Sequence, residues 1–362
     1  MADFLASVDA GNGGTNAVLV KGKSKPRRFY EPSVRAVATG DSLGLGKDLE
    51  IQYDYVDWYG HRYVTGDDVI RVTRRNLEHH LGTNRYGNEF HQFLVAVALA
   101  KLGVVEGTVD LTVFAPPGVY NEVSALMQAR FMDQGGEVII RLKADKQPRA
   151  WVYHTVTVWP EGIGAAACYI LDEKGDFVEN DVLAGETVLL DLGVYTLDAL
   201  KLVDGNFNPE ALEHATWEDA GLNVHLRQPL LRAVKAQSDE FGALTVDDID
   251  LVIRQGAATG DYTLRVAGYE VELLPLIDKH RERYAGWIAN NICDGVFNGF
   301  RGVRSVILVG GGADLVEPYL REWYGDKLVD RKSLAHTRKI HPIDMNAMGG
   351  LRLALMRQKQ AM

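Results

Sequence analysis

The sequence predicts a mixed α/β protein made of two similar halves, and two observations support this fold class. In the N-terminal third, candidate strands are followed by a helical segment and then by another buried strand, which is the order of a mixed sheet. Near Asp9 and again near Asp191, an apolar strand ends in Asp, a glycine comes two residues later, and a Thr opens the next strand. With 362 residues the chain is long enough for two cores.

The N-terminal third is predicted to be rich in strands. Its expected elements are strands at Phe4–Asp9, Thr15–Val20 and Arg27–Val37, a hairpin around Gly60, a helix over Asn88–Gly103 and a buried strand at Leu111–Ala115. The helix is indicated by apolar residues at helical spacing, which are Phe90, Phe93, Leu94 and Val97. Gly103 is the expected stop signal of this helix.

The second half repeats this organisation. Its expected elements are a buried strand at Thr187–Leu192, a return strand at Tyr195–Lys201, a mostly helical and polar stretch over 206–260, a long helix over Pro275–Val296, a buried strand at Ser305–Val309 and a closing helix at about 345–358. We find no low-complexity segment and no short-period repeat.

Composition narrows the class of protein. A net charge of −10 gives no overall field that favours DNA or an anionic membrane. Cys168 and Cys293 lie far apart, which argues against a disulfide framework or a zinc site. The first residues lack the pattern of a signal peptide, and no apolar window is long enough to span a membrane. We therefore expect a cytoplasmic protein.

The two repeated hairpins, "VDAGNGGTNAV" and "LDLGVYTLDAL", are candidates for phosphate binding. Glycine-rich bends leave backbone N–H groups open to anionic oxygens. An Asp beside phosphate requires a divalent cation or its bound waters between them. Each hairpin taken alone is also compatible with ordinary turn chemistry, since Asp and Gly are common turn residues.

Three further motifs follow in order along the chain. In "WPEGIGAAA", Glu161 precedes a helix start, where a carboxylate can orient water or complement the helix dipole. Gly310, Gly311 and Gly312 separate a buried strand from a helix, and they permit either close approach to a ligand or close strand–helix packing. Gly349 and Gly350 lie inside a helical pattern, which predicts close contact with another helix.

This ordered set of motifs resembles the actin-like ATPases, and "YEPSVRAV" and "GHRYVTGDDV" are similar to motifs of the plasmid-segregation, ParM-like branch. The resemblance covers nearly the whole chain. It implies a two-lobed actin-like (ribonuclease H-like) fold with ATP and Mg²⁺ in the interlobe cleft. One lobe would comprise residues 1–165 plus 336–362 and the other residues 186–335, with about 206–260 as a helical subdomain.

The resemblance also implies roles for individual residues. Asp9 and Asp191 would hold Mg²⁺ through water, and Glu161 would position the hydrolytic water. The expected nucleotide contacts are Gly11, Asn12, Gly13, Gly14, Thr15, Asn16, Gly193, Thr196 and, beside the adenosine, Gly310–Gly312. The chain departs from the family pattern at Asn16, where many relatives have Lys, and at Val194 and Tyr195, which replace a Gly-Thr pair. Nucleotide binding is thus the firmer expectation, and the rate of hydrolysis is open.

The implied function is ATP-dependent polymerisation that segregates plasmid DNA, with self-association and a DNA-binding adaptor protein but no direct contact with nucleic acid or membrane. A chromosomal or phage cytoskeletal homologue, and a sugar or small-molecule kinase using Asp67 or Asp68 as base, are the alternatives. The terminal "LRLALMRQKQAM" is read as the closing helix, with a membrane anchor as the other reading. The basic turn 21–28 is interpreted as a solvated hairpin tip, with a contact between filament subunits or with an adaptor as the other reading. His79, His80 and His91 are interpreted as surface or core histidines.

Overall fold

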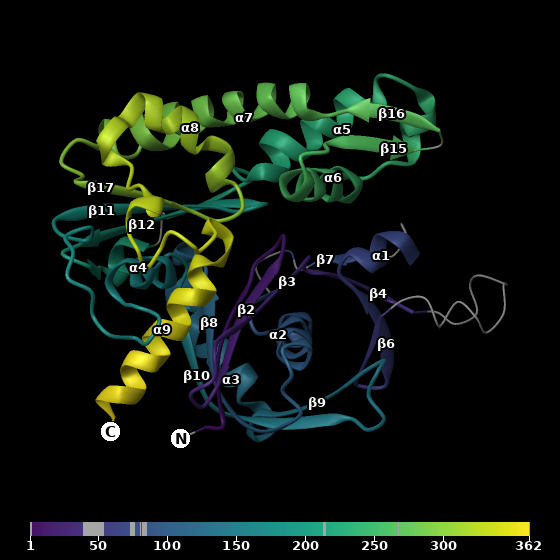
Figure 1. The fold of residues 1–362 in the computed structure, drawn as a ribbon, viewed down its shortest axis with the longest axis vertical. Helices are drawn as coiled ribbons and strands as arrows, with labels where there is room; N and C mark the ends of the chain where they lie inside the picture. Colours follow the sequence, from purple (N-terminus) through teal and green to yellow (C-terminus); the bar gives the residue numbers. More distant parts are fainter. Residues whose placement is uncertain are drawn as a thin grey trace.

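The fold was analysed in a computed structural model. It describes residues 2–38, 54–72, 77–79, 81, 85–212, 215–266 and 268–361. Two large sheets, a separate two-stranded sheet, and helices between and around them make up this part of the chain (Figure 1). No helix among the described residues has both the length and the apolar character needed to cross a membrane.

The larger sheet has the spatial order β3-β2-β1-β8-β10-β9-β5-β6-β4-β7. Its strands are β1 (Phe4–Ala10), β2 (Thr15–Lys21), β3 (Arg27–Glu31), β4 (Val34–Val37), β5 (Tyr55–Trp58), β6 (His61–Thr65), β7 (Glu78–His79), β8 (Glu106–Ala115), β9 (Glu137–Leu142) and β10 (Arg149–Pro160). Strand β1 pairs antiparallel with β2 and parallel with β8.

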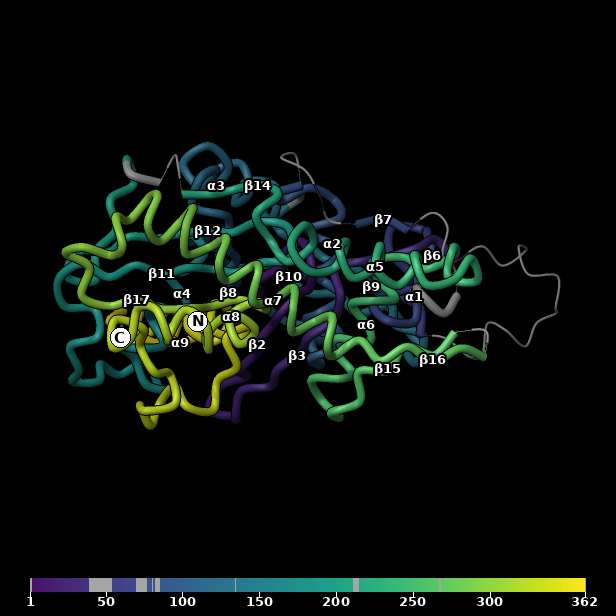
Figure 2. Tube along the Cα trace, turned by 90° about the horizontal axis from the view of Figure 1, so that it is seen from above, coloured from purple at the N-terminus to yellow at the C-terminus, as the bar shows by residue number. Residues whose placement is uncertain are grey.

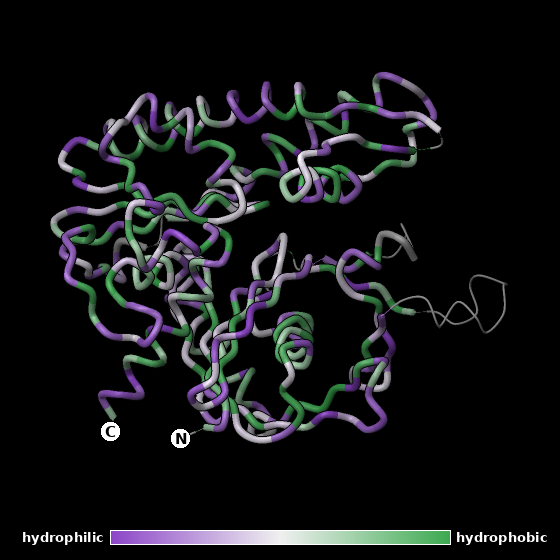
Figure 3. The backbone as a smooth tube through the Cα atoms, viewed as in Figure 1, coloured by the Kyte–Doolittle hydropathy of each residue, from purple (hydrophilic) through white to green (hydrophobic). Residues whose placement is uncertain are grey.

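The strands of the larger sheet curve around helix α2 (Glu89–Lys101), which lies at the centre of this part of the molecule (Figures 1 and 3). The helix is apolar on nearly every side, and ten of its residues are buried. A helix that is hydrophobic all round requires burial on all faces, which the curved sheet provides. Helix α3 (Pro117–Phe131) packs against β8 and β10, and the short α1 (Asp67–Val72) follows β6.

The smaller sheet repeats the same topology. Its order is β13-β12-β11-β17, with β14 also paired to β12. Its strands are β11 (Glu186–Leu192), β12 (Thr196–Val203), β13 (Asn206–Phe207), β14 (Thr216–Glu218) and β17 (Ser305–Val309). Strand β11 pairs antiparallel with β12 and parallel with β17, as β1 does with β2 and β8. The repeat seen in the sequence at Asp9 and Asp191 is therefore a repeat of structure.

Helices α4 (Ile163–Ile170) and α9 (Met345–Gln360) cross each other between the two sheets. Their side chains share one apolar core with residues of β1, β2, β11, β12 and β17. The crossing is unusually close, because a Cβ atom at Gly349 would lie 1.5 Å from the carbonyl oxygen of Gly164. The predicted helix–helix contact of Gly349 is thus confirmed. Gly350 instead faces the larger sheet, at Ser7 and Phe114.

The remaining helices cover the outer face of the smaller sheet and extend sideways over the larger one. They are α5 (Gln228–Lys235), α6 (Val246–Thr259), α7 (Leu274–Ile288) and α8 (Ala313–Tyr324). Seen from above, α6 and the hairpin β15–β16 (Thr263–Val266 and Tyr269–Glu272) lie on the same side of the molecule as α1 and β6 (Figure 2). Helix α6 contacts α1 directly.

Three predicted elements differ from the structure. The strand predicted over Arg27–Val37 is broken at Pro32, because the ring of proline removes a backbone donor. After the break, β4 pairs with β6 and β7 instead of β2. The stretch 206–260 contains two short strands besides its helices. The long helix is α-helical only to Ile288 and continues as a π-helix over Ala289–Asp294.

Candidate active site

Asp9 and Asp191 lie at equivalent places, near the ends of β1 and β11. In the strand registers, Asp9 is paired with Asn16 and Asp191 with Asp198. Residues directly opposite each other on antiparallel strands share one face of the sheet. Each hairpin therefore presents a carboxylate together with one further polar side chain, which is Asn16 beside Asp9 and Asp198 beside Asp191.

The two hairpin turns touch each other. A Cβ atom at Gly13 would lie 2.1 Å from Cγ2 of Val194, and one at Gly14 would lie 2.5 Å from the ring of Tyr30. Neither of these glycines, nor Gly11 or Gly193, has a positive φ. The turns therefore need no left-handed backbone conformation at these positions. They need glycine for close approach, and Val194 occupies part of the space between them.

The second turn is fixed by the segment that leads into α5. Backbone N–H groups donate from Leu222 to the carbonyl of Gly193 at 3.1 Å and from Asn223 to that of Val194 at 2.6 Å. Because these carbonyls already accept hydrogen bonds from the protein, the turn keeps its shape without a second glycine.

Four carboxylates converge where the two hairpins meet, namely Asp9, Glu161, Asp191 and Asp198. Burial raises the pKa of Asp191 to about 8, and the charges of Asp9 and Asp198 add to the rise. Burial likewise raises the pKa of Asp9 to about 6 and that of Asp198 to about 6. The pKa of Glu161 is raised well above its usual value, first by burial and then by these neighbours.

Glu161 is held at the junction of β10 and α4, as the sequence predicts. Its N–H donates to the carbonyl of Ala115 at 2.8 Å, and Gly162 follows with a φ of 92° that favours glycine. The turn directs the chain from the sheet into the helix, and Glu161 is thereby placed within electrostatic reach of Asp9, Asp191 and Asp198.

Two members of the site were not among the predicted residues. Asp198 is 3% exposed and accepts hydrogen bonds from the hydroxyls of Thr196 and Thr216. Its cross-strand pairing with Asp191 was a signal available in the sequence, since both lie in the quoted hairpin. Arg85 is buried just before α2, and its charge opposes the rise in the pKa values of Asp9, Asp198 and Glu161. Nothing local in the sequence singles it out.

The three consecutive glycines after β17 pack against the end of β11. A Cβ atom at Gly310 would lie 2.3 Å from Oδ1 of Asp191, and one at Gly312 would lie 3.0 Å from Cβ of Leu192. At Gly311 the nearest such contact is an ordinary 3.5 Å. Close packing therefore accounts for two of the glycines and brings this loop next to Asp191.

Ion pairs join the two parts of the molecule beside the hairpin turns. Arg254 of α6 donates to both oxygens of Asp67 in α1, at 2.7 and 3.2 Å, and also to Asp250 at 2.8 Å. His79 of β7 lies 3.8 Å from a carboxylate oxygen of Asp247. The carboxylate of Asp67 is thus engaged by arginine, which disfavours its use as a kinase base.

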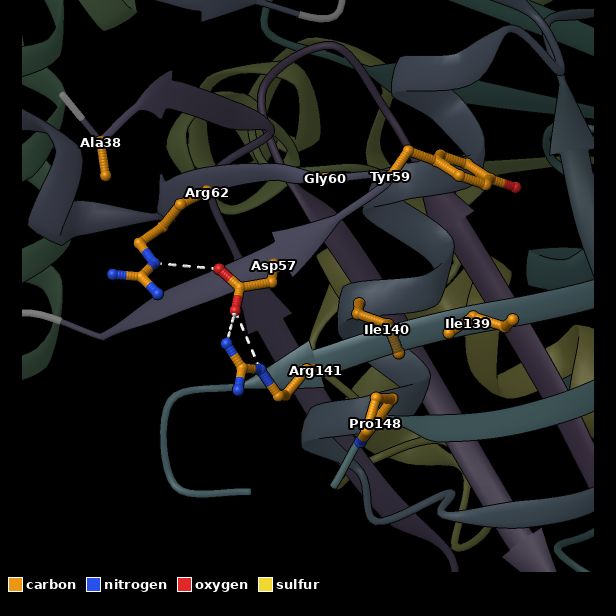
Figure 4. Close-up of a pocket in the computed structure, with 9 residues that line it drawn as sticks. All are labelled: Ala38, Asp57, Tyr59, Gly60, Arg62, Ile139, Ile140, Arg141 and Pro148. Carbon is orange, nitrogen blue, oxygen red and sulfur yellow. Dashed lines mark hydrogen bonds and ion pairs between the residues drawn. The ribbon is translucent and has the colours of Figure 1, made fainter. Parts of the chain in front are cut away.

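His91 and a large cavity lie outside the carboxylate cluster. His91 is buried in the core, and His80 lies outside the described residues. A cavity of about 700 Å³ lies on the β5–β6 hairpin and β9, where Asp57 binds Arg62 and Arg141 (Figure 4). None of the predicted site residues lines this cavity.

The residues of the cluster fit a hydrated divalent cation. No group of three or more His, Cys, Asp or Glu side chains in the described part of the chain is arranged to ligate a metal directly. Buried carboxylates with raised pKa values would be relieved by a nearby cation. Within the described residues, Oδ1 of Asn12 and Oδ1 of Asn16 are buried acceptors without a hydrogen-bond partner, which suits the hydrogens of metal-bound water.

The raised pKa values predict that stability without a cation falls as pH rises. A carboxyl whose pKa is higher in the folded state favours folding below its unfolded pKa and loses that contribution through its folded pKa. We expect the free energy of unfolding to drop by roughly 3 kcal/mol between about pH 5 and pH 8.5 in chelator. Chemical unfolding at a series of pH values measures this.

A matched pair of variants tests which group causes the free energy of unfolding to fall as pH rises. Asp191→Asn should reduce the dependence of the free energy of unfolding on pH. Asp239→Asn, at an exposed position, should leave this dependence unchanged. Stability that is constant or increases over this pH interval would contradict the prediction.

The comparisons with known proteins agree with this geometry. Residues 7–164 match the family model described as actin like proteins N terminal domain. A comparison with curated protein sequences finds no match. Similar solved structures include a 15-stranded ParM filament from Clostridium botulinum, with 18% identity, a TM-score of 0.70 and coverage of 99% of this chain and 100% of that chain.

Two further structures were solved with nucleotide. An archaeal actin homologue in complex with ADP has 21% identity and a TM-score of 0.69, over 98% of this chain and 99% of that chain. Bacillus thuringiensis ParM with AMPPNP has 17% identity and a TM-score of 0.66, over 98% and 99% of the two chains. At these identities the matches establish the fold. The chain has the actin-like fold over nearly its whole length, and the fold expected from the sequence is confirmed.

Proposed function

We propose that this chain is a cytoplasmic actin-like ATPase, which forms filaments in a nucleotide-dependent manner and thereby segregates plasmid DNA. The observation that carries the proposal is the convergence of Asp9, Asp191 and Glu161 between two touching hairpin turns. The similarity to ParM structures, one of them a filament and one with an ATP analogue, supports it. We assign one lobe to residues 1–165 plus 336–362 and the other to residues 186–335.

In this proposal, different groups of the chain bind the phosphates, the adenosine, Mg²⁺ and the attacking water. Backbone N–H groups of the turn 11–14 and of Gly193 bind the phosphates, and the glycine loop 310–312 borders the adenosine. Asp9 and Asp191 would hold Mg²⁺ through water, and that ion would neutralise charge on the phosphates. Glu161 orients a water molecule and accepts its proton, for which its raised pKa suits it.

The proposed partners are further copies of this chain and a DNA-binding adaptor protein. A net charge of −10 disfavours direct binding to DNA, because phosphate contacts depend on Lys and Arg. An adaptor of opposite charge would link the filament to its cargo.

The decisive experiment is assembly of the purified chain. We expect light scattering to rise on addition of Mg²⁺ and ATP or a non-hydrolysable analogue, and the protein to sediment. Neither ADP nor ATP in chelator should do this to the same extent. No polymer with any nucleotide over a range of salt and magnesium, together with turnover stimulated by a small hydroxyl compound, would favour a kinase instead.

A further inference from the structure

Asn346 occupies the second position of α9 and lies where that helix crosses α4. Its side chain is buried, with 4% of the residue exposed. A buried amide has a donor and an acceptor end, and each needs a partner. Both ends of this amide have partners, and the partners come from opposite sides of the site.

The donor end faces the hairpin carboxylates. Nδ2 of Asn346 donates to Oδ2 of Asp191 at 2.8 Å. A hydrogen bond with Asn346 also lowers the pKa of Asp9, against the larger rise that burial causes. This amide is therefore shared by the two aspartates that end β1 and β11.

The acceptor end faces the turn that carries Glu161. Oδ1 of Asn346 accepts from the N–H of Gly162 at 2.9 Å and from that of Ala165 at 3.4 Å. Helix α4 has no capping side chain of its own, so this oxygen from α9 satisfies donors at its N-terminus. Rotating the amide by half a turn would place like groups opposite each other at both ends.

The backbone holds the amide in this position. A Cβ atom at Gly164 would lie 2.2 Å from the carbonyl oxygen of Asn346, so only glycine at this position lets α9 lie this close to α4. On the far side of the turn, the N–H of Glu161 is bound to Ala115. The peptide that precedes the Glu161 side chain is thus fixed by the sheet, and the peptide that follows it is fixed by Asn346.

From these contacts we infer that Asn346 is a positioning residue for hydrolysis, which links Asp191 in the smaller sheet to Glu161 beside the larger one. This inference rests on the proposed function. A displacement of Asp191 relative to α9 changes the position of the Asn346 side-chain amide, which is hydrogen-bonded to Asp191. The amide in turn sets the orientation of the Glu161–Gly162 peptide. Binding of nucleotide and activation of water are thereby coupled through one side chain.

The test compares Asn346→Ala and Asn346→Asp with Asn180→Ala. Asn180 is also a bridging asparagine, whose side chain bonds Tyr169 and Val182 away from the site. We expect Asn346→Ala to lower kcat for ATP by about 10–100-fold, the range typical of residues that orient a reactive group, with KM changed by less than about threefold. Asn346→Asp keeps the acceptor for Gly162 but places a like charge where the donor to Asp191 was, so it should lower kcat by about tenfold and also lower Tm as pH rises.

A purely structural role would lower Tm without lowering the kcat of the folded protein. A kcat equal to that of the parent in Asn346→Asp would overturn the role of Asn346, and so would equal losses of kcat in Asn346→Ala and Asn180→Ala. In either case, ATP hydrolysis by the parent would uphold the proposed function. A parent chain that polymerises but hydrolyses no nucleotide would overturn this inference and the ATPase activity of the proposed function, and would leave nucleotide-dependent assembly standing. A parent that neither binds nucleotide nor polymerises would overturn both.

Discussion

Replacing Glu161 by alanine should slow phosphate release by about 10²–10³-fold while assembly with Mg²⁺ and ATP is retained. The carboxylate lies at the cluster of acidic groups, and its raised pKa makes it a better proton acceptor than an exposed glutamate. The backbone of the turn is held by hydrogen bonds of Ala115 and Asn346, which the substitution leaves in place. Phosphate release and sedimentation on the same sample measure both effects.

Two further variants sharpen this experiment. Glu161→Gln preserves the shape of the side chain but cannot accept the proton, so it should resemble Glu161→Ala in rate. Glu173→Ala, at an exposed position, should behave as the parent. Equal rates of phosphate release in parent and Glu161→Ala would remove Glu161 from this role.

Replacing Gly349 by alanine should destabilise the protein by about 4 kcal/mol or more, or prevent folding. The new Cβ would lie 1.5 Å from the carbonyl oxygen of Gly164 and 2.4 Å from its carbonyl carbon. Both are backbone atoms, so no side-chain rotation relieves the overlap, and α9 must move away from α4. Urea unfolding of the purified variant, or its loss from the soluble fraction, measures the effect.

Gly286→Ala is the matched control for this prediction. It also lies inside a helix, α7, but a Cβ atom there meets no atom within 4 Å. Alanine should therefore stabilise the protein by roughly 0.5–1 kcal/mol, because glycine is the poorer helix former. Similar stability changes in the two variants would show that the packing of the α4–α9 crossing is not what requires Gly349.

Local patterns in the sequence predicted several strands and helices closely, whereas α3, β9 and most of β10 were not predicted. Ser305–Val309 agrees with β17 at both ends, and the hairpin at Gly60 is β5–β6, with positive φ at Tyr59 and Gly60. The errors arose where pairing partners decide the structure. No apolar pattern indicates that β4 leaves β3 at Pro32 to pair with β6, because that partner is distant in sequence.

In the candidate site, too, some features were predicted from local sequence and others depend on residues that are distant in sequence. The turn 11–14, Glu161 and the glycine loop were predicted because each combines a strand end with residues of special chemistry within a few positions. The structure adds the reason for Gly13 and Gly14, since a Cβ atom there would meet Val194 of the second hairpin and Tyr30 of the neighbouring strand β3. The roles given to Asp9 and Asp191 as holders of Mg²⁺ stay predictions.

The sequence by itself determined the two hairpins with their aspartates, the helix start after Glu161 and the actin-like fold class. The hairpins and the helix start follow from the periodicity, turn residues and helix signals of contiguous segments, and the actin-like fold class was implied by the resemblance of the ordered motifs to that family. Only the tertiary structure decided that Arg85 joins the acidic cluster and that Asn346 bridges Asp191 to Gly162. Such contacts join segments as much as 184 residues apart, and strand register and helix crossing fix them rather than any local preference.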